Sequence, residues 1–158
     1  MQTAMRHTFR PTEVRDIPSL YVVRASTRQN AISQEQLIAW GITPESTAQG
    51  LLSHEYFGMV CEDNGAIVGF CTGNTTTGEI MVLAVLPEYE GQGIGKALLD
   101  GVVARLQKLD LASLWLACSP DPASRSHGFY RANGWVANGA RLENGDEVLT
   151  CIMVLSPH

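Results

Sequence analysis

The 158-residue sequence has few charged and few aromatic residues, 17% and 7% of the chain, and its acidic residues outnumber the basic ones to give a net charge of −5. A chain without an excess of Lys and Arg suits neither nucleic acid nor an anionic membrane, whereas it does suit a cationic amine. No apolar stretch is long enough to span a bilayer, and the first residues lack the apolar core of a secretory signal. We therefore expect a cytoplasmic protein that binds neither nucleic acid nor membrane.

Metal-ligand spacing is also missing from the sequence. The four cysteines stand far apart in apolar segments, without the close pairs that zinc sites use. Isolated cysteines in apolar segments are typical of small buried hydrophobic side chains in a reducing compartment. We therefore expect no metal site and four buried thiols, at Cys61, Cys71, Cys118 and Cys151.

The chain length and the 45% hydrophobic content favour a single domain over residues 1–158, large enough to enclose a core. Helix-start signals recur in the first third of the chain. Asp16 is expected to cap a first helix, and Ser33 with Gln36 forms a capping box for a second. Thr43-Pro44 begins a third helix.

Strand patterns dominate from residue 56 onward. Asp63-Asn64-Gly65 separates two of them and predicts a hairpin. The apolar segment 113–118 follows a long helix, so it is expected to run parallel to the strand before that helix. The full set of expected strands is 8–10, 56–62, 66–75, 79–86, 113–118, 135–141 and 147–155, with a short helix at 123–133.

Residues 79–100 (EIMVLAVLPEYEGQGIGKALLD) combine strand, turn and helix signals. Residues 79–86 are rich in Val, Ile and Leu, as in a strand buried on both faces. Pro87 ends that strand because proline has no N–H to donate. Glycines then recur at 91, 93 and 95, and apolar residues at helical spacing begin at Ile94. The stretch predicts a strand, a glycine-rich turn and a helix.

A glycine-rich turn before a helix is suited to binding phosphate. The backbone can approach a ligand closely, unpaired N–H groups point out of the first turn, and the helix dipole favours an anion. Lys96 in that turn opposes the dipole unless an anion lies nearby. A plain tight turn with a surface lysine is the alternative. The P-loop pattern is excluded because Ala97 follows Lys96, and the glycine spacing excludes the dinucleotide fingerprint.

This stretch resembles the acetyl-CoA signature of the GNAT superfamily of N-acetyltransferases, Arg/Gln-x-x-Gly-x-Gly/Ala after a strand, often with Pro-Glu-Tyr before it. Here 83–89 (LAVLPEY) leads into 90–95 (EGQGIG), and the resemblance extends from residue 79 to 135. One departure is Glu90, which stands at the Arg/Gln position. Because a carboxylate beside a diphosphate is unfavourable, we expect Glu90 to turn outward and contribute only its backbone.

The resemblance implies a mixed α/β fold of the α+β kind, a centrally splayed sheet of six to seven strands flanked by about four helices. It also implies acetyl-CoA as co-substrate, with its pantetheine arm along the central strand near Leu83 and Val85, where an N–H polarises the acetyl carbonyl. Ala123 or Ser124 stands where many members have Asn, and Ser124 is expected to serve as a weaker hydrogen-bonding substitute. The expected cofactor-binding residues are Leu83, Ala84, Val85, Glu90, Gly91, Gln92, Gly93, Ile94, Gly95, Lys96 and Ser124.

Two catalytic residues are expected from the resemblance. Tyr130 lies in a segment similar to the family's Phe-Tyr-x-x-x-Gly-Phe, and its phenol can protonate the leaving thiolate. A core tyrosine is the alternative. Glu79 begins the central strand, where some members carry a glutamate base. It is equally consistent with an acidic strand end, Glu55 or Tyr56 could face the acceptor instead, and an amine that is partly neutral needs no base.

The sequence thus predicts an acetyl-CoA-dependent N-acetyltransferase that moves the acetyl group directly to a primary amine of a small molecule or peptide, through a ternary complex. A non-catalytic acyl-CoA-binding or regulatory module on the same fold is the alternative. A homodimer is compatible with either function. Fold and cofactor motif are shared across many acceptors, so the sequence leaves the identity of the amine open.

Overall fold

The computed structural model describes residues 7–111 and 113–152. The strands are β1 (His7–Pro11), β2 (Tyr56–Asp63), β3 (Ala66–Asn74), β4 (Ile80–Val85), β5 (Ser113–Cys118), β6 (Val136–Arg141) and β7 (Glu147–Ile152). The helices are α1 (Ile17–Ala25), α2 (Gln34–Ala39), α3 (Pro44–Leu52), α4 (Ile94–Gln107) and α5 (Arg125–Ala132), with short 3-10 turns at Val14–Asp16 and Pro87–Tyr89. The expected end of the last strand, 153–155, lies outside the described residues.

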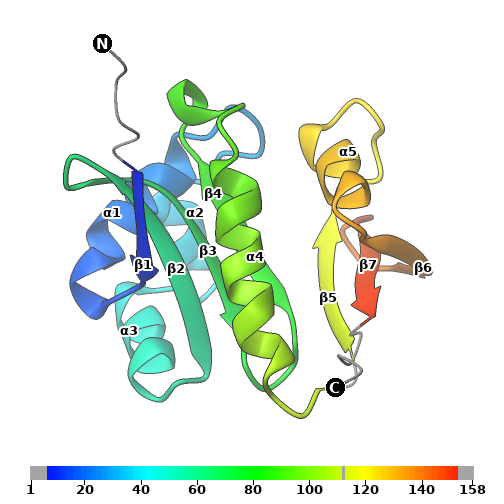
Figure 1. Ribbon diagram of the computed structural model, residues 1–158, viewed down its shortest axis with the longest axis horizontal. Helices are drawn as coiled ribbons and strands as arrows, with labels where there is room; N and C mark the ends of the chain where they lie inside the picture. The colour runs from blue at the N-terminus through cyan, green and yellow to red at the C-terminus, as the bar shows by residue number, and fades with distance from the viewer. Residues whose placement is uncertain (1–6, 112, 153–158) are drawn as a thin grey trace.

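The strands form two sheets, one in the order β1-β2-β3-β4 and one in the order β5-β7-β6 (Figure 1). The predicted hairpin between β2 and β3 is confirmed, since Asn64 and Gly65 both have positive φ, as a type I′ turn requires. A single parallel bridge, Glu79 to Trp115, joins the two sheets within the described residues. The predicted α/β fold with a central splay is therefore confirmed.

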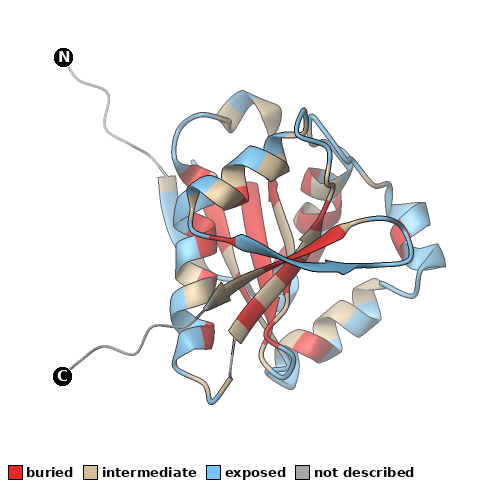
Figure 2. Cartoon of the chain, turned by 90° about the vertical axis from the view of Figure 1, so that its right-hand side faces the viewer, coloured by how far each residue is buried: buried red, intermediate tan, exposed pale blue. Residues whose placement is uncertain are grey.

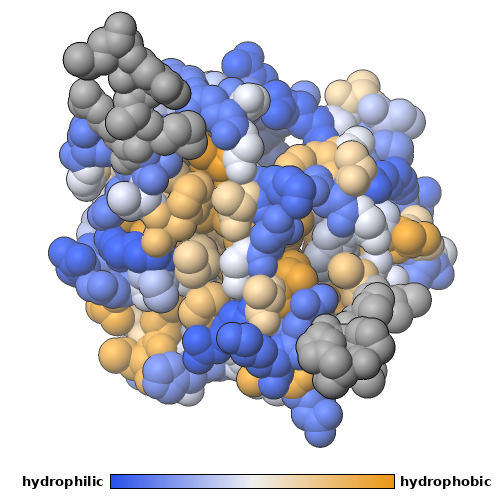
Figure 3. All heavy atoms as spheres, viewed as in Figure 1, coloured by the Kyte–Doolittle hydropathy of each residue, from blue (hydrophilic) through white to orange (hydrophobic). Residues whose placement is uncertain are grey.

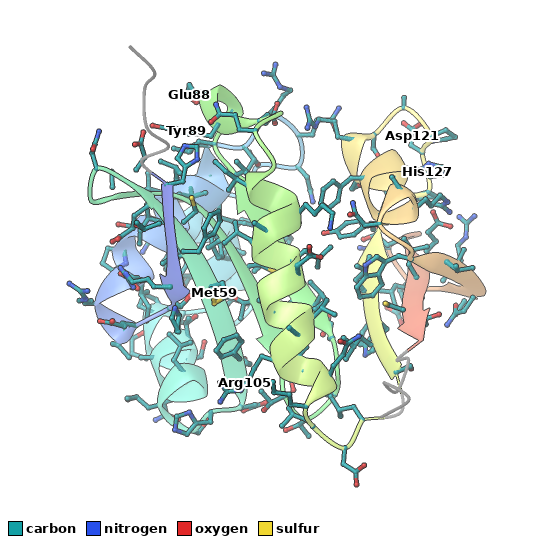
Figure 4. The ribbon with its side chains drawn as sticks, in the orientation of Figure 1. Met59, Glu88, Tyr89, Arg105, Asp121 and His127 are labelled. Carbon is teal, nitrogen blue, oxygen red and sulfur yellow. The ribbon has the colours of Figure 1, made fainter. Side chains whose placement is uncertain are left out.

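Helix α4 packs between the two sheets and supplies much of the core. Its buried face is apolar at helical spacing, and it meets Leu114, Leu116 and Leu149 of the second sheet. Toward the first sheet, Gly101 lies close to Met59, and the Arg105 guanidinium stacks on the Phe57 ring, 4.8 Å from its centroid (Figure 4). The buried residues of α4 are Ile94, Leu98, Leu99, Val102 and Leu106.

Helix α1 covers the opposite face of the first sheet, where Leu20 and Val23 pack on Val60 and Phe70. The first sheet is therefore covered on both faces, whereas β6 at the edge of the second sheet is exposed along its whole length (Figure 2). Helices α2 and α3 begin where predicted. Ser33 accepts the Gln36 N–H at 3.1 Å, and Thr43 accepts that of Ser46 at 2.9 Å. No helix within the described ranges is both long and apolar enough to cross a membrane.

The expectation that Asp16 caps α1 with its side chain is wrong. Asp16 stands at the start of the helix, but its carboxylate is buried against the Arg10 guanidinium, with both N–O distances at 2.8 Å, and accepts the Glu13 N–H at 2.7 Å. Burial alone would raise the pKa of Asp16, and the bonds from Arg10 and Glu13 outweigh it and hold that pKa below its usual range. The carboxylate therefore binds Arg10 and the backbone of the preceding 3-10 turn, and it makes no cap bond to α1.

The cysteines behave as the sequence predicts. Within the described chain all four are unpaired thiols, three of them buried and Cys151 half-buried. Burial raises the pKa of Cys61 to about 11 and raises that of Cys71 further, so both remain protonated at neutral pH. These thiols therefore serve as core side chains.

Candidate functional site

Strand β4 leaves one of its edges open along most of its length. On the other edge it pairs with β3, and a register shift leaves Met81 without a partner, a bulge that bends the strand beyond its single bridge to β5. The expectation that this segment is buried on both faces is wrong, because only Ile80 and Ala84 of the strand are buried and its other side chains are half-buried or exposed.

Backbone alternation decides which residues of β4 present bonding groups to the open edge. Leu86 donates its N–H to the Val68 carbonyl of β3 at 2.9 Å. Alternate residues of a strand direct their N–H and C=O groups to opposite edges, so Ala84 also faces β3, whereas Leu83 and Val85 face away. The two residues expected to meet the pantetheine arm are therefore those with unpaired backbone groups toward β5.

The splay between β4 and β5 opens into a cavity of about 870 Å³. Its volume lies in the range of small-molecule sites, at the carboxyl ends of two parallel strands where α/β sheets commonly bind ligands. Three walls meet there: β4 with the glycine turn, β5 with α5, and the end of α1 with the loop after it. Nearly all of the predicted site residues line it: Glu79, Leu83, Ala84, Val85, Glu90, Gly91, Gly93, Ile94, Gly95, Lys96, Ser124 and Tyr130.

The glycine turn has the geometry expected of an anion site. Gly91 and Gly93 adopt left-handed backbone conformations, with φ of 78° and 81°, and a Cβ on either would meet no atom within 4 Å. The first bond of α4 runs from the Ala97 N–H to the Gly93 carbonyl at 3.1 Å. The N–H groups of the first helical turn, residues 94–96, thus have no partner in the helix. This turn is open and rich in donors.

Tyr130 of α5 is held on the opposite wall by aromatic packing. Its ring meets Phe129 and Trp135 edge to face, at centroid distances of 5.2 and 6.2 Å. The residue is buried, and burial raises the pKa of its phenol, while the charge of nearby Arg24 acts in the opposite sense. Tyr130 is therefore a neutral phenol at physiological pH. Among the described residues no group accepts a hydrogen bond from it, so its proton is available to a ligand in the cavity.

Comparison with known protein families gives a match that agrees with this geometry. The acetyltransferase (GNAT) family profile aligns with residues 17–135, about three quarters of the chain. The protein belongs to the GNAT acetyltransferase family. A curated relative, the ribosomal protein bS18-alanine N-acetyltransferase of Haemophilus influenzae, is 29% identical over 94 residues, 58% of this chain and 62% of the relative. The Escherichia coli K12 enzyme of the same name is 26% identical over 112 residues, 70% of this chain and 68% of that one.

A solved structure shares the same fold. The PaiA N-acetyltransferase of Thermoplasma acidophilum, crystallised in complex with coenzyme A, superposes with a TM-score of 0.77 at 19% identity, over 94% of this chain and 99% of that one. The expected GNAT resemblance is thereby confirmed, and it covers the described structure well beyond the glycine turn.

Glu79 lies where the GNAT cleft closes, at the only bridge between β4 and β5 in the described chain. It lines the cavity and is half-buried, and burial raises the pKa of its carboxyl. The alternative residues Glu55 and Tyr56 do not line the cavity. Glu55 precedes β2, and the Tyr56 ring packs against Gly50 of α3. Of the two carboxylates considered as the base, Glu79 and Glu55, only Glu79 lines the cavity.

The helix that carries Tyr130 begins later than expected, because Ser124 acts as its N-cap. The Ser124 hydroxyl accepts the His127 N–H at 3.3 Å and also lines the cavity. His127 is not part of the cavity lining, so it has no direct contact with the site. Ser124 thus combines a structural role at α5 with a place in the cavity lining.

The expectation that Glu90 turns outward is wrong. Its carboxylate is 15% exposed and accepts hydrogen bonds from Arg28 Nε at 2.8 Å and from Arg125 Nη1 at 3.1 Å. Lys96 instead pairs with Asp100, one turn along α4, at 2.7 Å. Arg28 and Arg125 therefore bring positive charge to the predicted anion site from outside the glycine turn.

Sequence reasoning missed a group of cavity-lining residues. They come from the last turn of α1 and the loop after it, from Trp40, from the turn after β4, from the end of β5 and from α5, and from the turn between β6 and β7. Arg24 shows why they were missed: a cation in the last turn of a helix is ordinary, and nothing local shows that it borders the cavity. The missed residues with polar or aromatic side chains are Arg24, Thr27, Arg28, Gln29, Asn30, Trp40, Tyr89, Ser119, Arg125, Ser126, Phe129, Asn144 and Asp146.

Proposed function

We propose that the protein is an acetyl-CoA-dependent N-acetyltransferase that moves an acetyl group directly from the thioester to a primary amine of a small molecule or peptide, within a ternary complex. The observation that carries the proposal is the cavity between β4 and β5, where the two strands separate. An open edge of β4 leads to the N-terminus of α4, and the Tyr130 phenol lies in the same cavity. Residues 1–158 would form a single acetyltransferase domain.

The residues present fit the co-substrate. The cavity suits an extended ligand with a phosphate end, because Gly91 and Gly93 leave room above the donors of the first α4 turn. At the other end, the outward backbone groups of Leu83 and Val85 can bond a pantetheine amide and polarise the acetyl carbonyl. Acetyl-CoA, when bound, supplies the acetyl group and leaves as a thiol. No group of three or more possible metal ligands occurs in residues 7–111 and 113–152.

Two side chains would transfer the protons of the reaction. Glu79 accepts the proton that the amine loses as its nitrogen bonds to the acetyl carbon. Tyr130 donates a proton to the departing sulfur as the C–S bond breaks, and regains one from solvent afterwards. Both line the cavity, Glu79 from just before β4 and Tyr130 from α5, so the acceptor nitrogen and the sulfur would have separate partners.

A peptide amine is the acceptor class that the relatives favour. The curated relatives modify an alanine of a ribosomal protein, and alanine has no side-chain nitrogen, so the target there is a backbone α-amine. In this chain Trp40, 59% exposed, and Asp146 both line the cavity. An exposed indole offers apolar and cation–π contact and a carboxylate offers negative charge, which together suit a cationic chain end.

The direct test of the function is thiol release from acetyl-CoA. We expect release with peptides that begin with alanine, accompanied by the mass gain of one acetyl group on the peptide. The same peptides with a blocked N-terminus are the matched control and should be inert. Thiol release with a panel of small amines tests whether a small molecule is the acceptor instead. Tight binding of acetyl-CoA with no thiol release for any amine would favour the non-catalytic acyl-CoA-binding module instead.

Glu79→Gln is expected to lower kcat/KM about 10-fold at pH 6.5 and to approach wild-type activity near pH 9. A peptide α-amine has a pKa of about 8, so a proton acceptor matters most when the amine is charged. Burial raises the pKa of Glu79. As the pH falls through this raised pKa, Glu79 of the wild type becomes protonated and no longer accepts the proton of the amine. Parallel pH–rate profiles for wild type and variant would return Glu79 to a structural role. Glu55→Gln, outside the cavity, is the matched control.

A further inference from the structure

The carboxylate of Glu90 joins two arginines that are far away in the sequence. It lies 62 residues from Arg28 and 35 from Arg125, yet one oxygen, Oε1, accepts from Arg28 Nε at 2.8 Å and from Arg125 Nη1 at 3.1 Å. The Glu90 side chain is 15% exposed, whereas the two arginine side chains are 58% and 56% exposed. Glu90 is thus enclosed by its partners, and they remain accessible.

A third bond links two of these three segments directly. The backbone N–H of Arg125, the first residue of α5, donates to Gln29 Oε1 at 2.9 Å. The loop after α1, the turn after β4 and the start of α5 are therefore tied together at one end of the cavity. In Figure 3, mostly hydrophilic side chains lie along the upper edge of this face, where Figure 1 shows the turn before α4 and the start of α5.

The charge count at this junction favours an anion. Two guanidiniums surround one carboxylate, which leaves an excess of one positive charge beside Gly91. Each guanidinium has five N–H donors, and the bonds to Glu90 use one nitrogen of each. Both arginines line the same cavity as the first turn of α4. Guanidiniums bind phosphate oxygens with strong, charge-assisted bonds.

We propose that Glu90 is a positioning residue that holds Arg28 and Arg125 as ligands for the diphosphate of CoA. The inference rests on the proposed function and adds two ligands from outside the glycine turn. Where the resembling motif has Arg or Gln, this chain has a carboxylate and brings its cations from the loop after α1 and from α5. The alternative is that Glu90 and the two arginines form a surface ion pair that only holds the loops together. Such a pair contributes little to stability or binding.

The first test compares ligands with and without phosphate by calorimetry. Arg28→Gln with Arg125→Gln should raise the Kd for CoA about 100-fold and raise that for 3′-dephospho-CoA equally. Binding of pantetheine, which has no phosphate, should not change. Arg15→Gln with Arg141→Gln removes the same charge away from the cavity and should leave the Kd for CoA within about 2-fold of wild type. Thermal unfolding verifies that the variants fold.

Glu90→Gln separates positioning from simple charge repulsion by the sign of its effect. If Glu90 positions the arginines, the variant binds CoA about 5- to 10-fold more weakly although it loses a negative charge. In the Arg28→Gln, Arg125→Gln background the same change should tighten binding, because the carboxylate there only repels phosphate. Tighter binding in the otherwise wild-type protein would overturn the positioning role.

Other outcomes separate this inference from the proposed function. Equal Kd values for CoA in the wild type and the double arginine variant would overturn the inference alone. A loss that vanishes with 3′-dephospho-CoA would overturn the diphosphate assignment. A folded wild type that does not bind CoA at all would overturn the proposed function, and the inference with it.

Discussion

Replacing Tyr130 by Phe is expected to lower kcat about 100-fold, the low end for loss of a general acid, with little change in the affinity for acetyl-CoA. The change removes only the hydroxyl and keeps the ring that Phe129 and Trp135 pack against. Because the proton is donated only as the C–S bond breaks, kcat and kcat/KM should fall together. Steady-state kinetics with calorimetry of acetyl-CoA binding measure both.

Two controls define the role of the Tyr130 hydroxyl. Tyr21→Phe changes another buried tyrosine, whose hydroxyl donates to the Ile42 carbonyl at 3.1 Å and which does not line the cavity. It should cost about 1 kcal/mol of unfolding free energy and leave kcat unchanged. An activated thioester, whose thiolate hardly needs protonation, should suffer less from Tyr130→Phe than acetyl-CoA does. A stably folded Tyr130→Phe protein with near-wild-type turnover would rule out the acid role.

Replacing Gly93 by Asp is expected to raise the Kd for acetyl-CoA about 100-fold. Gly93 is the N-cap of α4 with φ of 81°, and its position faces open space at the proposed diphosphate site. An added carboxylate there opposes the diphosphate by several kcal/mol at an effective dielectric constant of about 20. Calorimetry of acetyl-CoA binding measures the loss.

Gly93→Asn is the matched control for that charge. Asn and Asp are similar in size, and both tolerate the left-handed conformation better than other residues that have a Cβ. The Asn variant therefore carries the same backbone strain and side-chain bulk without the charge. We expect it to bind acetyl-CoA at least 10-fold more tightly than the Asp variant. Equal affinities for both would mean that no phosphate lies near Gly93.

The parts of the fold that depend on neighbouring residues could be predicted from the sequence. Asn64-Gly65 requires a type I′ turn, and the alternating glycines between an apolar strand and a helix pattern predict the turn at Gly91–Gly95. The separation of β4 from β5 came from the family resemblance, since apolar residues alone do not show where two strands part. The bulge at Met81 shows this limit, because its residue type is ordinary for a strand.

The errors at Asp16 and Glu90 share one physical cause, which is a charged side chain whose partner is not its neighbour. Asp16 was assigned to its own helix and instead binds Arg10 of β1. Glu90 was expected to turn outward because a carboxylate beside a diphosphate is unfavourable, but the fold brings Arg28 and Arg125 to it. Long-range ion pairs of this kind follow from tertiary contacts, which local patterns do not encode.

Amide hydrogen exchange along β4 tests most directly that the open edge of this strand receives acetyl-CoA. Leu83 and Val85 face away from β3, whereas Ala84 between them already faces it and serves as an internal control. On addition of saturating CoA, exchange at Leu83 and Val85 should slow by at least 10-fold relative to Ala84. Binding of CoA that leaves the exchange of Leu83 and Val85 unchanged would contradict this account.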